Sequence, residues 1–411
     1  MTKFKKWLNF PISVFVDSQV FIQESYDFSS KGKLSYFKKL IDNGKVKLLT
    51  SIIVKKEVEH HLKGDLEKGI DRLRSAQEDR GLAIFRETPY SHYFQPLNLN
   101  SMVDEAIVIL DTYFSSANVT WLAINEIDLN NVISNYFGGC PPFGKSKKKS
   151  EFPDAFNASM LQHYANNGGE VYIVSGDSDF NYLDNAFCYK TLGELLDAIN
   201  SQDEICFQSK TYIENTAVKK SIFDKVESIL IDSGYELNVD GTDTDRKGLS
   251  SGYDYDEVDL QSVSPRVLSD FEAIDIDYDN QLIIITARCD TVLEFDCSFF
   301  DEDNSIWDSE DKEYVLVHYG TMHEIHNVPF IVTINVHFEG NGKAAETVFD
   351  IEDVSVDMDI ELNQYTLQED GRNRIDISNN HWDEDIEDHN YTCPDCCCAI
   401  NAENDGGNGF C

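Results

Sequence analysis

The short run Ile12-Ser-Val-Phe-Val16, followed at once by Asp17, is the stretch that decides the fold of this chain. An apolar, β-branched run that ends at an acidic residue is typical of a buried strand in a parallel sheet. Similar runs lie at residues 46–50 and 170–175. Segments with a helical pattern separate them, at residues 34–42, 52–63, 65–83, 102–115 and 154–166. This alternation predicts an α/β fold with a central parallel sheet over the first 200 residues.

The hydrophobic period changes to two further along the chain. Residues 281–287, 314–319 and 330–338 alternate apolar and polar side chains, which predicts short antiparallel strands in a sandwich or a small barrel. We therefore expect four parts: an α/β domain at 1–200, a helical and acidic linker at 201–268, a sandwich-like antiparallel β-rich domain at 269–370, and an acidic segment with a Cys-rich tail at 371–411.

The charge is divided unevenly between the two halves. Residues 1–200 hold 25 acidic and 22 basic side chains, whereas residues 201–411 hold 49 and 12. The first half is thus close to neutral and can approach a polyanion, while the second half repels one. We expect a nucleic acid to contact only the first half, and a basic protein partner to suit the second.

Several protein classes are disfavoured by the composition. No stretch offers the roughly 18 uncharged apolar residues that a membrane helix needs. The basic start is followed by an apolar run that Asp17 interrupts, with no small-residue cleavage site, so a secretory signal is not expected. Five of the ten cysteines lie within residues 393–411, which does not fit a disulfide scaffold. We expect a cytoplasmic protein that does not enter a membrane.

Carboxylates stand where the predicted strands end. Asp17 follows the first strand, Glu57 lies on the helix after the second, Asp154 opens a later helix, and Asp177 and Asp179 follow the strand at 170–175. Ligands of open α/β sheets bind at the carboxyl ends of the strands. Carboxylates gathered there repel one another unless a cation neutralises them, and Mg²⁺ or Mn²⁺ prefers such oxygen ligands. The pattern predicts metal-dependent phosphodiester hydrolysis.

Four motifs together resemble the PIN-domain nuclease family over about residues 10–200. They are Phe15-Val-Asp17-Ser-Gln-Val-Phe21, the helix with Glu57, Glu151-Phe-Pro-Asp154-Ala-Phe, and Val174-Ser-Gly-Asp177-Ser-Asp179-Phe. The likeness is greatest to a branch with Pro-Pro-Phe-Gly and a Lys-rich loop before the Phe-Pro-Asp-Ala motif.

The resemblance implies a Rossmann-like three-layer fold and a Mg²⁺- or Mn²⁺-dependent nuclease, commonly acting on single-stranded RNA. Carried over by position, the catalytic and metal-binding quartet is Asp17, Glu57, Asp154 and Asp177, with Asp179 as an auxiliary ligand and Ser175 as an orienting hydroxyl that contacts substrate. Gln19 stands where the family often has a small polar residue such as Asn.

A basic run precedes the third acidic motif. Lys145, Lys147, Lys148 and Lys149 lie just before Asp154. Such a run is either a solvated loop or a grip on substrate phosphates beside the metal site.

An aromatic cluster forms a second possible substrate contact. Tyr90, His92, Tyr93 and Phe94 lie within five residues. They either stack on nucleic-acid bases or fill a hydrophobic core.

The Cys-rich tail predicts a zinc site. Cys393-Pro-Asp-Cys396 is a tight turn that presents two thiolates to one Zn²⁺, and Cys411 is a third candidate ligand of a partial zinc-ribbon-like knuckle. The fourth ligand is Cys398, Cys397, His389 or a residue of a partner. The alternative is a reduced tail without metal. The acidic run at 383–388 favours a protein contact over nucleic acid for this tail.

The sequence therefore predicts a cytoplasmic metal-dependent endoribonuclease that acts on single-stranded RNA, with an acidic accessory region. Two alternatives stay open. One is a structure-selective DNA nuclease that uses the same site. The other is a catalytically inactive interaction module that retains the fold.

Overall fold

The computed structural model describes residues 8–78, 82–95, 98–116, 118–143, 151–177, 180–233, 255–302, 305–308, 312–340, 347–358, 391–392 and 399–400. The chain divides into two compact units. The first contains Met1–Glu214, Phe271–Thr286 and Asn335–Glu352, and the second contains Asn215–Asp270, Ala287–Ile334 and Asp353–Cys411. The predicted four-part division stays a prediction.

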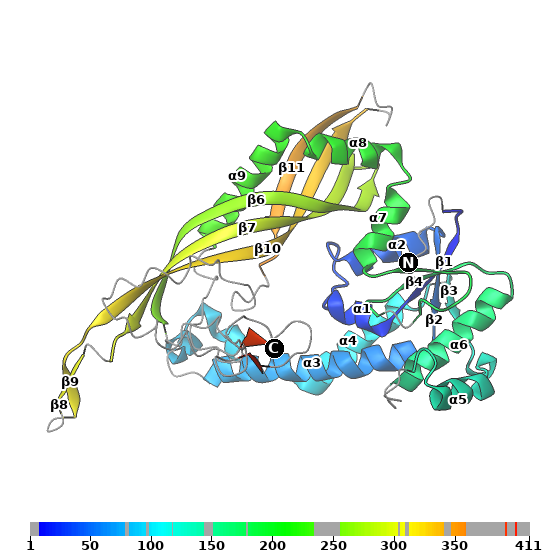
Figure 1. The fold of residues 1–411 in the computed structure, drawn as a ribbon, viewed down its shortest axis with the longest axis horizontal. Helices are drawn as coiled ribbons and strands as arrows, with labels where there is room; N and C mark the ends of the chain where they lie inside the picture. Colours follow the sequence, from blue (N-terminus) through cyan, green and yellow to red (C-terminus); the bar gives the residue numbers. More distant parts are fainter. Residues whose placement is uncertain are drawn as a thin grey trace. The chain divides into compact units, whose positions relative to one another are not determined.

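A parallel sheet of five strands forms the centre of the first unit (Figure 1). Its strands are β1 (Ile12–Val16), β2 (Val46–Thr50), β3 (Val119–Trp121), β4 (Val171–Val174) and β5 (Ala186–Tyr189), in the order β3-β2-β1-β4-β5. All four neighbouring pairs are parallel, which confirms the predicted α/β fold. Strands β3 and β5 are three and four residues long, too short to show a periodic signal in the sequence.

Helices alternate with these strands along the chain and follow them. They are α1 (Ser18–Gln23), α2 (Lys33–Asp42), α3 (Ile52–Glu78), α4 (Leu99–Tyr113), α5 (Leu129–Gly138), α6 (Phe152–Asn166), α7 (Leu192–Asn200) and α8 (Glu204–Ile213), with 3₁₀ turns η1 (Ala83–Glu87), η2 (Pro89–Phe94) and η3 (Ile124–Glu126). Within the described part of the chain, no helix combines the length and the apolar character needed to cross a membrane.

Helix α3 is one unbroken helix where the sequence predicted two successive helical segments, at residues 52–63 and 65–83. It continues for 27 residues, past Gly64 and Gly69, each of which costs a helix interior about 1 kcal/mol relative to Ala. Val58, Leu62 and Ile70 keep the helical spacing across both glycines and are all buried. Packing of this apolar stripe therefore outweighs the local preference of the two glycines.

The centre of the sheet is covered on both faces. Val14, Phe15 and Val16 are consecutive residues of β1, so their side chains point to alternate faces, yet at most 2% of each is exposed. Phe180 packs on Phe15 with ring centroids 5.7 Å apart. This contact anchors the segment just after β4 to the core, next to the carboxyl end of β1.

The later part of the chain forms antiparallel strands, as predicted. A four-stranded sheet contains β6 (Tyr255–Asp277), β7 (Leu282–Phe300), β10 (Tyr319–Glu339) and β11 (Val348–Val356) in the order β11-β10-β7-β6, and residues of each of these strands occur in both compact units. Helix α9 (Thr216–Asp232) precedes it, and β8 (Ile306–Asp308) pairs with β9 (Glu313–Leu316), as β12 (Tyr391–Thr392) does with β13 (Ala399–Ile400).

The expected sandwich or barrel is not what these strands form. The four long strands belong to a single sheet, and no second sheet of comparable size occurs among the described residues. Buried side chains alternate with half-buried or exposed ones along β7 and β10, as a period of two requires. The period shows that one face of the sheet is buried more deeply than the other, and it does not specify whether a second sheet or helices cover the buried face.

Candidate active site

Asp17 lies at the carboxyl edge of the parallel sheet, directly after β1. It is the N-cap of α1, and only 5% of it is exposed. The Ser18 N–H donates to Oδ1 at 2.7 Å, and the Ser175 hydroxyl donates to Oδ2 at 2.8 Å. Burial raises the pKa of Asp17; these two hydrogen bonds oppose the shift, and the nearby charge of Asp177 adds to it.

Ser175 connects Asp17 to Asp177. The residues that end β1 and β4 are paired, Val16 with Val174, so the next residues along each strand lie side by side. The Ser175 hydroxyl donates to Asp17 and accepts from the Asp177 N–H at 3.2 Å. Asp177 is exposed, so its carboxylate lies at the surface of the site. One buried hydroxyl thus fixes the geometry between two carboxylates that are 160 positions apart in the sequence.

Glu57 joins the same group from α3, which packs against α1. The side chain is half-buried, and burial raises its pKa. A hydrogen bond from Ser18 opposes this pKa shift, and the charge of Asp17 adds to it. Ser18 therefore contacts both carboxylates. Sequence reasoning did not single out Ser18, although its place immediately after Asp17 was the available signal.

Asp154 lies in the first turn of α6 and is half-buried. Asn157, one turn later on the same side of the helix, is completely buried. The Ser51 hydroxyl, at the end of β2, donates to Asn157 Oδ1 at 2.7 Å and accepts from the Val54 N–H at 3.1 Å. This bond brings the beginning of α6 to the carboxyl edge of the sheet. An Asn within a mostly apolar helix was the sequence signal that reasoning missed.

Two glutamine side chains line the loop that carries Asp177. A methyl group placed on Gly176 would lie 3.2 Å from Gln23 Nε2 and 3.5 Å from Gln19 Oε1. Gln19 therefore reaches the loop after β4, at a position where the resemblance led us to expect a shorter polar side chain. The missing side chain at Gly176 leaves room for both amides.

Some residues of the predicted sites lie outside the described residues. They are the auxiliary ligand Asp179, the basic run Lys145, Lys147, Lys148 and Lys149, and the zinc candidates Cys393, Cys396, Cys398 and Cys411. Their roles stay predictions from the sequence.

The oxygen donors at this edge are of the kind that Mg²⁺ or Mn²⁺ binds, but they are not closed around an ion. The charge of Asp177 acts on Asp17, and the charge of Asp17 acts on Glu57. The structure gives none of the three an ion pair with a described Lys, Arg or His. Among the described residues, no three His, Cys, Asp or Glu side chains stand close enough together to hold a metal ion.

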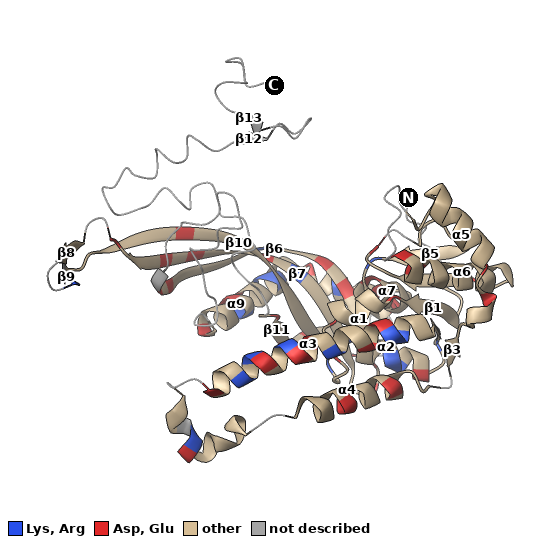
Figure 2. Cartoon of the chain, turned by 90° about the horizontal axis from the view of Figure 1, so that it is seen from below, with Lys and Arg blue, Asp and Glu red and all other residues tan. Residues whose placement is uncertain are grey.

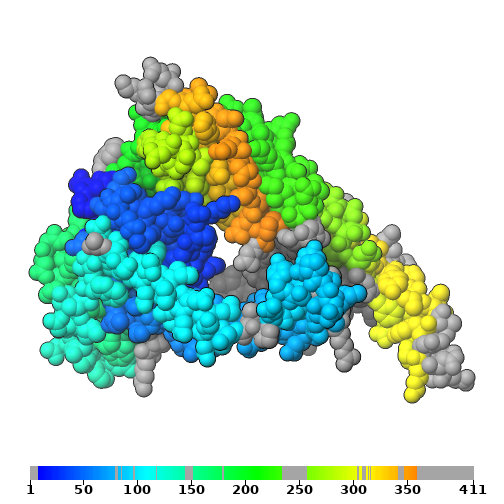
Figure 3. All heavy atoms as spheres, turned by 180° about the vertical axis from the view of Figure 1, so that it is seen from behind, coloured from blue at the N-terminus to red at the C-terminus, as the bar shows by residue number. Residues whose placement is uncertain are grey.

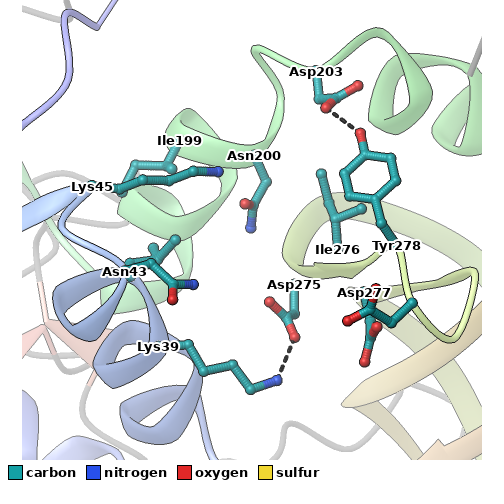
Figure 4. A pocket seen from close by; sticks show the side chains of 12 residues that line it. Lys39, Asn43, Lys45, Ile199, Asn200, Asp203, Asp275, Ile276, Asp277 and Tyr278 are labelled. Atoms are coloured by element: carbon teal, nitrogen blue, oxygen red, sulfur yellow. Dashed lines mark hydrogen bonds and ion pairs between the residues drawn. The ribbon is translucent and has the colours of Figure 1, made fainter.

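A second acidic hollow lies at the opposite edge of the same sheet (Figure 4). This cavity of about 410 Å³ is near the Lys45 carbonyl, which accepts from the first residue of β1. Its carboxylates have partners within the protein: Asp275 pairs with Lys39 at 2.7 Å, and Asp203 accepts from the Tyr278 hydroxyl. Asp277 accepts two bonds from Asn280. These acids stabilise local structure, so we do not take the hollow as the active site.

One of the comparisons with known proteins matches the part of the chain that carries these residues. Residues 14–180 match the sequence model of a family described as the PIN domain. No curated protein and no solved structure matches the chain. The matched range contains Asp17, Glu57, Asp154 and Asp177, and it ends at the Phe180 anchor. Residues 14–180 are thus similar to the PIN domain, a nuclease-type fold that is commonly metal-dependent.

Proposed function

We propose that this protein is a metal-dependent endonuclease that hydrolyses phosphodiester bonds of single-stranded RNA. The observation that carries the proposal is the Ser175 hydroxyl, which joins Asp17 to the Asp177 backbone at the carboxyl edge of the sheet. A buried carboxylate held this firmly, with no cationic side chain bonded to it, contributes little to packing. It is explained by a ligand that carries positive charge.

Asp17, Glu57, Asp154 and Asp177 would hold Mg²⁺ or Mn²⁺. Such an ion, when bound, supplies an activated water and stabilises the leaving oxygen. The raised pKa values of Asp17 and Glu57 support this assignment, because burial disfavours their charged forms and a cation would restore them. Ser175 and Ser18 keep Asp17 oriented in either case.

The exposed position of Asp177 leaves the outer side of the site open to a nucleic acid strand. The near-neutral first half does not repel phosphates, whereas a charge like that of the second half would. We assign phosphate binding to Lys145, Lys147, Lys148 and Lys149, and RNA as the substrate, on the resemblance to PIN nucleases. The zinc knuckle and a basic partner for the acidic half are separate proposals that rest on the sequence alone.

The test is a cleavage panel with the full-length protein. Labelled 20-nucleotide single-stranded RNA, single-stranded DNA and both duplexes are incubated with Mg²⁺, Mn²⁺ or EDTA. We expect internal cleavage of the single-stranded RNA with metal, none with EDTA, and none by the Asp17→Asn/Asp177→Asn variant. Asp275→Asn, in the opposite hollow, is the matched control and should cleave normally.

Two outcomes would change the assignment. Cleavage of DNA in preference to RNA would replace the substrate and keep the metal site. A wild-type protein that cleaves none of the four substrates with either metal would overturn the enzyme assignment in favour of an inactive interaction module.

A further inference from the structure

The aromatic turn η2 is exposed at the far end of α3. Tyr90 is 58% and Tyr93 is 64% exposed, His92 is exposed, and no residue of η2 is buried. The sequence left open whether these rings fill a core or stack on bases. The exposure of both tyrosines rules out the first reading for them, and large exposed aromatic groups gathered in one turn call for a partner.

The turn is built into the structure by hydrogen bonds to α3. Gln77, in the last turn of the helix, donates through Nε2 to the Tyr93 carbonyl at 2.6 Å and to the Gln95 carbonyl at 3.2 Å. Arg86 Nη2 donates to the Gln77 carbonyl at 2.7 Å. Thr88 caps the turn, and Pro89 fixes its first residue. The rings are therefore presented on a defined backbone.

The shape and charge of the turn suit nucleobases. The His92 and Tyr93 rings lie with centroids 4.0 Å apart and are tilted by 40° to each other, so two planar groups are gathered at one place where a base can stack on an exposed ring face. Arg86 is exposed beside the turn, and Figure 2 shows further basic residues along α3, interleaved with acids. Exposed aromatic rings next to basic side chains are the arrangement that binds single strands, by stacking and phosphate contacts.

The turn and the candidate active site share one helix. Glu57 and Gln77 are both on α3, twenty residues apart, which corresponds to about 30 Å along the axis. A stacked strand advances about 3.4 Å per nucleotide, so about nine nucleotides span this length. Figures 1 and 3 show α3 and the light-blue segment at its end, which lies at the surface.

The face of α3 that leads to Gln77 also carries an apolar groove of about 470 Å³. Leu62, Leu66, Ile70 and Leu73 line it from α3, Tyr26 lines it from the turn after α1, and Met102 lines it from α4. Unpaired bases have apolar faces, so the groove adds a surface suited to them before the aromatic turn.

We propose that η2 is a base-stacking site for single-stranded nucleic acid, which holds the substrate strand about 30 Å along α3 from Glu57. The proposal rests on the proposed nuclease function for the class of ligand. It predicts that affinity depends on strand length, because a short oligonucleotide at the active site cannot reach the turn.

Binding is measured separately from chemistry, by fluorescence anisotropy in EDTA with labelled 20-nucleotide and 5-nucleotide oligouridine. In the Tyr90→Ala/Tyr93→Ala variant, we expect affinity for the 20-mer to fall about 10-fold and affinity for the 5-mer to stay unchanged. Tyr90→Phe/Tyr93→Phe keeps the rings and should bind as the wild type does. Phe207→Ala, which removes another exposed ring (70% exposed) on α8, is the matched control.

The same variants are then assayed for cleavage with Mn²⁺, where we expect a higher KM for the 20-mer and an unchanged kcat. The proposal is overturned if the alanine variant binds the 20-mer as tightly as the wild type, if the phenylalanine variant loses as much affinity, or if the wild type binds no oligonucleotide. Binding through η2 without cleavage would instead refute the nuclease assignment and leave this site standing.

Discussion

The two acidic regions at opposite edges of the parallel sheet are similar in composition, but their carboxylates differ in burial and in electrostatic partners. At the carboxyl edge, Asp17 and Glu57 are held in partly or fully buried positions, and burial raises the pKa of each. At the amino edge, Asp275 is paired with Lys39, and hydrogen bonds from Asn280 lower the pKa of Asp277 (Figure 4). The structure shows no described cationic side chain paired with Asp17 or Glu57 in the first region, whereas the acids of the second region are stabilised by partners within the protein.

This difference shows why a count of acids does not identify a metal site. A carboxylate with a lysine or a turn amide beside it already has its stabilising partner within the protein. A carboxylate that is buried with only hydroxyl and backbone N–H donors is a better candidate for a cation ligand. The predictions below test that contrast, from the largest expected effect to the smallest.

The strongest test compares single neutral substitutions at the two edges. Asp17→Asn should reduce cleavage of single-stranded RNA about 100-fold or more, because it removes charge from the centre of the site. Asp275→Asn should leave the rate within about twofold of the wild type. Initial cleavage rates with Mn²⁺ measure the effect of each substitution. Equal losses of rate in the two variants would show that the carboxyl edge has no special role in cleavage.

Metal binding should stabilise the protein through the carboxyl edge alone. A ligand at 100 times its Kd adds about 2.7 kcal/mol to the free energy of unfolding, so Mn²⁺ should raise Tm by several degrees. Asp17→Asn should abolish this rise, and Asp277→Asn should retain it. Thermal unfolding with and without Mn²⁺ measures these changes in Tm. If Mn²⁺ still raises the Tm of the Asp17→Asn variant, the metal binds elsewhere.

Ser175 should matter through the hydroxyl that it donates to Asp17. Hydrogen bonds to charged groups contribute about 1.5–3 kcal/mol, so Ser175→Ala should weaken Mn²⁺ binding about 10-fold. Ser175→Thr keeps a hydroxyl and should recover most of the affinity. Calorimetric titration gives both values, and an alanine variant with wild-type affinity would show that Asp17 needs no such support.

In the metal-free protein, the contributions of the two edges to the free energy of unfolding should depend on pH with opposite signs. The raised pKa of Asp17 means that the native state takes up a proton before the unfolded chain does, so its contribution to stability increases as pH falls from 7 towards about 4. Asp277 has a lowered pKa, so it stabilises above about pH 4 and this stabilisation is lost as pH falls further.

At pH 7 without metal, Asp17→Asn should therefore raise Tm slightly, and Asp277→Asn should lower it slightly, each by roughly a few degrees at most. Thermal unfolding across pH 4–8 in EDTA checks both signs. A drop in Tm on Asp17→Asn would show that the metal-free carboxylate is well stabilised where it stands.

Much of the fold was predictable because its signals are local. The run that ends at Asp17 predicted β1, and residues 46–50 were predicted with the observed bounds of β2. Alternation with helical segments predicted the parallel sheet. The two segments that form α3 were both predicted as helical. Their continuity across Gly64 and the single four-stranded sheet were not, because buried neighbours decide whether a glycine is tolerated within a helix and what covers a sheet face.

The candidate site was predictable only as a set of acidic residues. Their places at strand ends implied one edge of the sheet, but nothing in the sequence pairs Ser51 with Asn157 or assigns Ser18 to Glu57. Such bonds join residues that are distant along the chain, and short-range patterns carry no information about them. The same holds for Asp203, Asp275 and Tyr278, whose contacts form only in the folded chain.

The sequence by itself determined the parallel sheet, the order of the acidic residues along it and the unequal charge of the two halves, because periodicity and composition act over short distances. Only the tertiary structure decided which carboxylates are buried without a cationic partner and that Tyr90 and Tyr93 face solvent. Burial and electrostatic pairing depend on neighbours brought together from far along the chain, and the folded state alone supplies them.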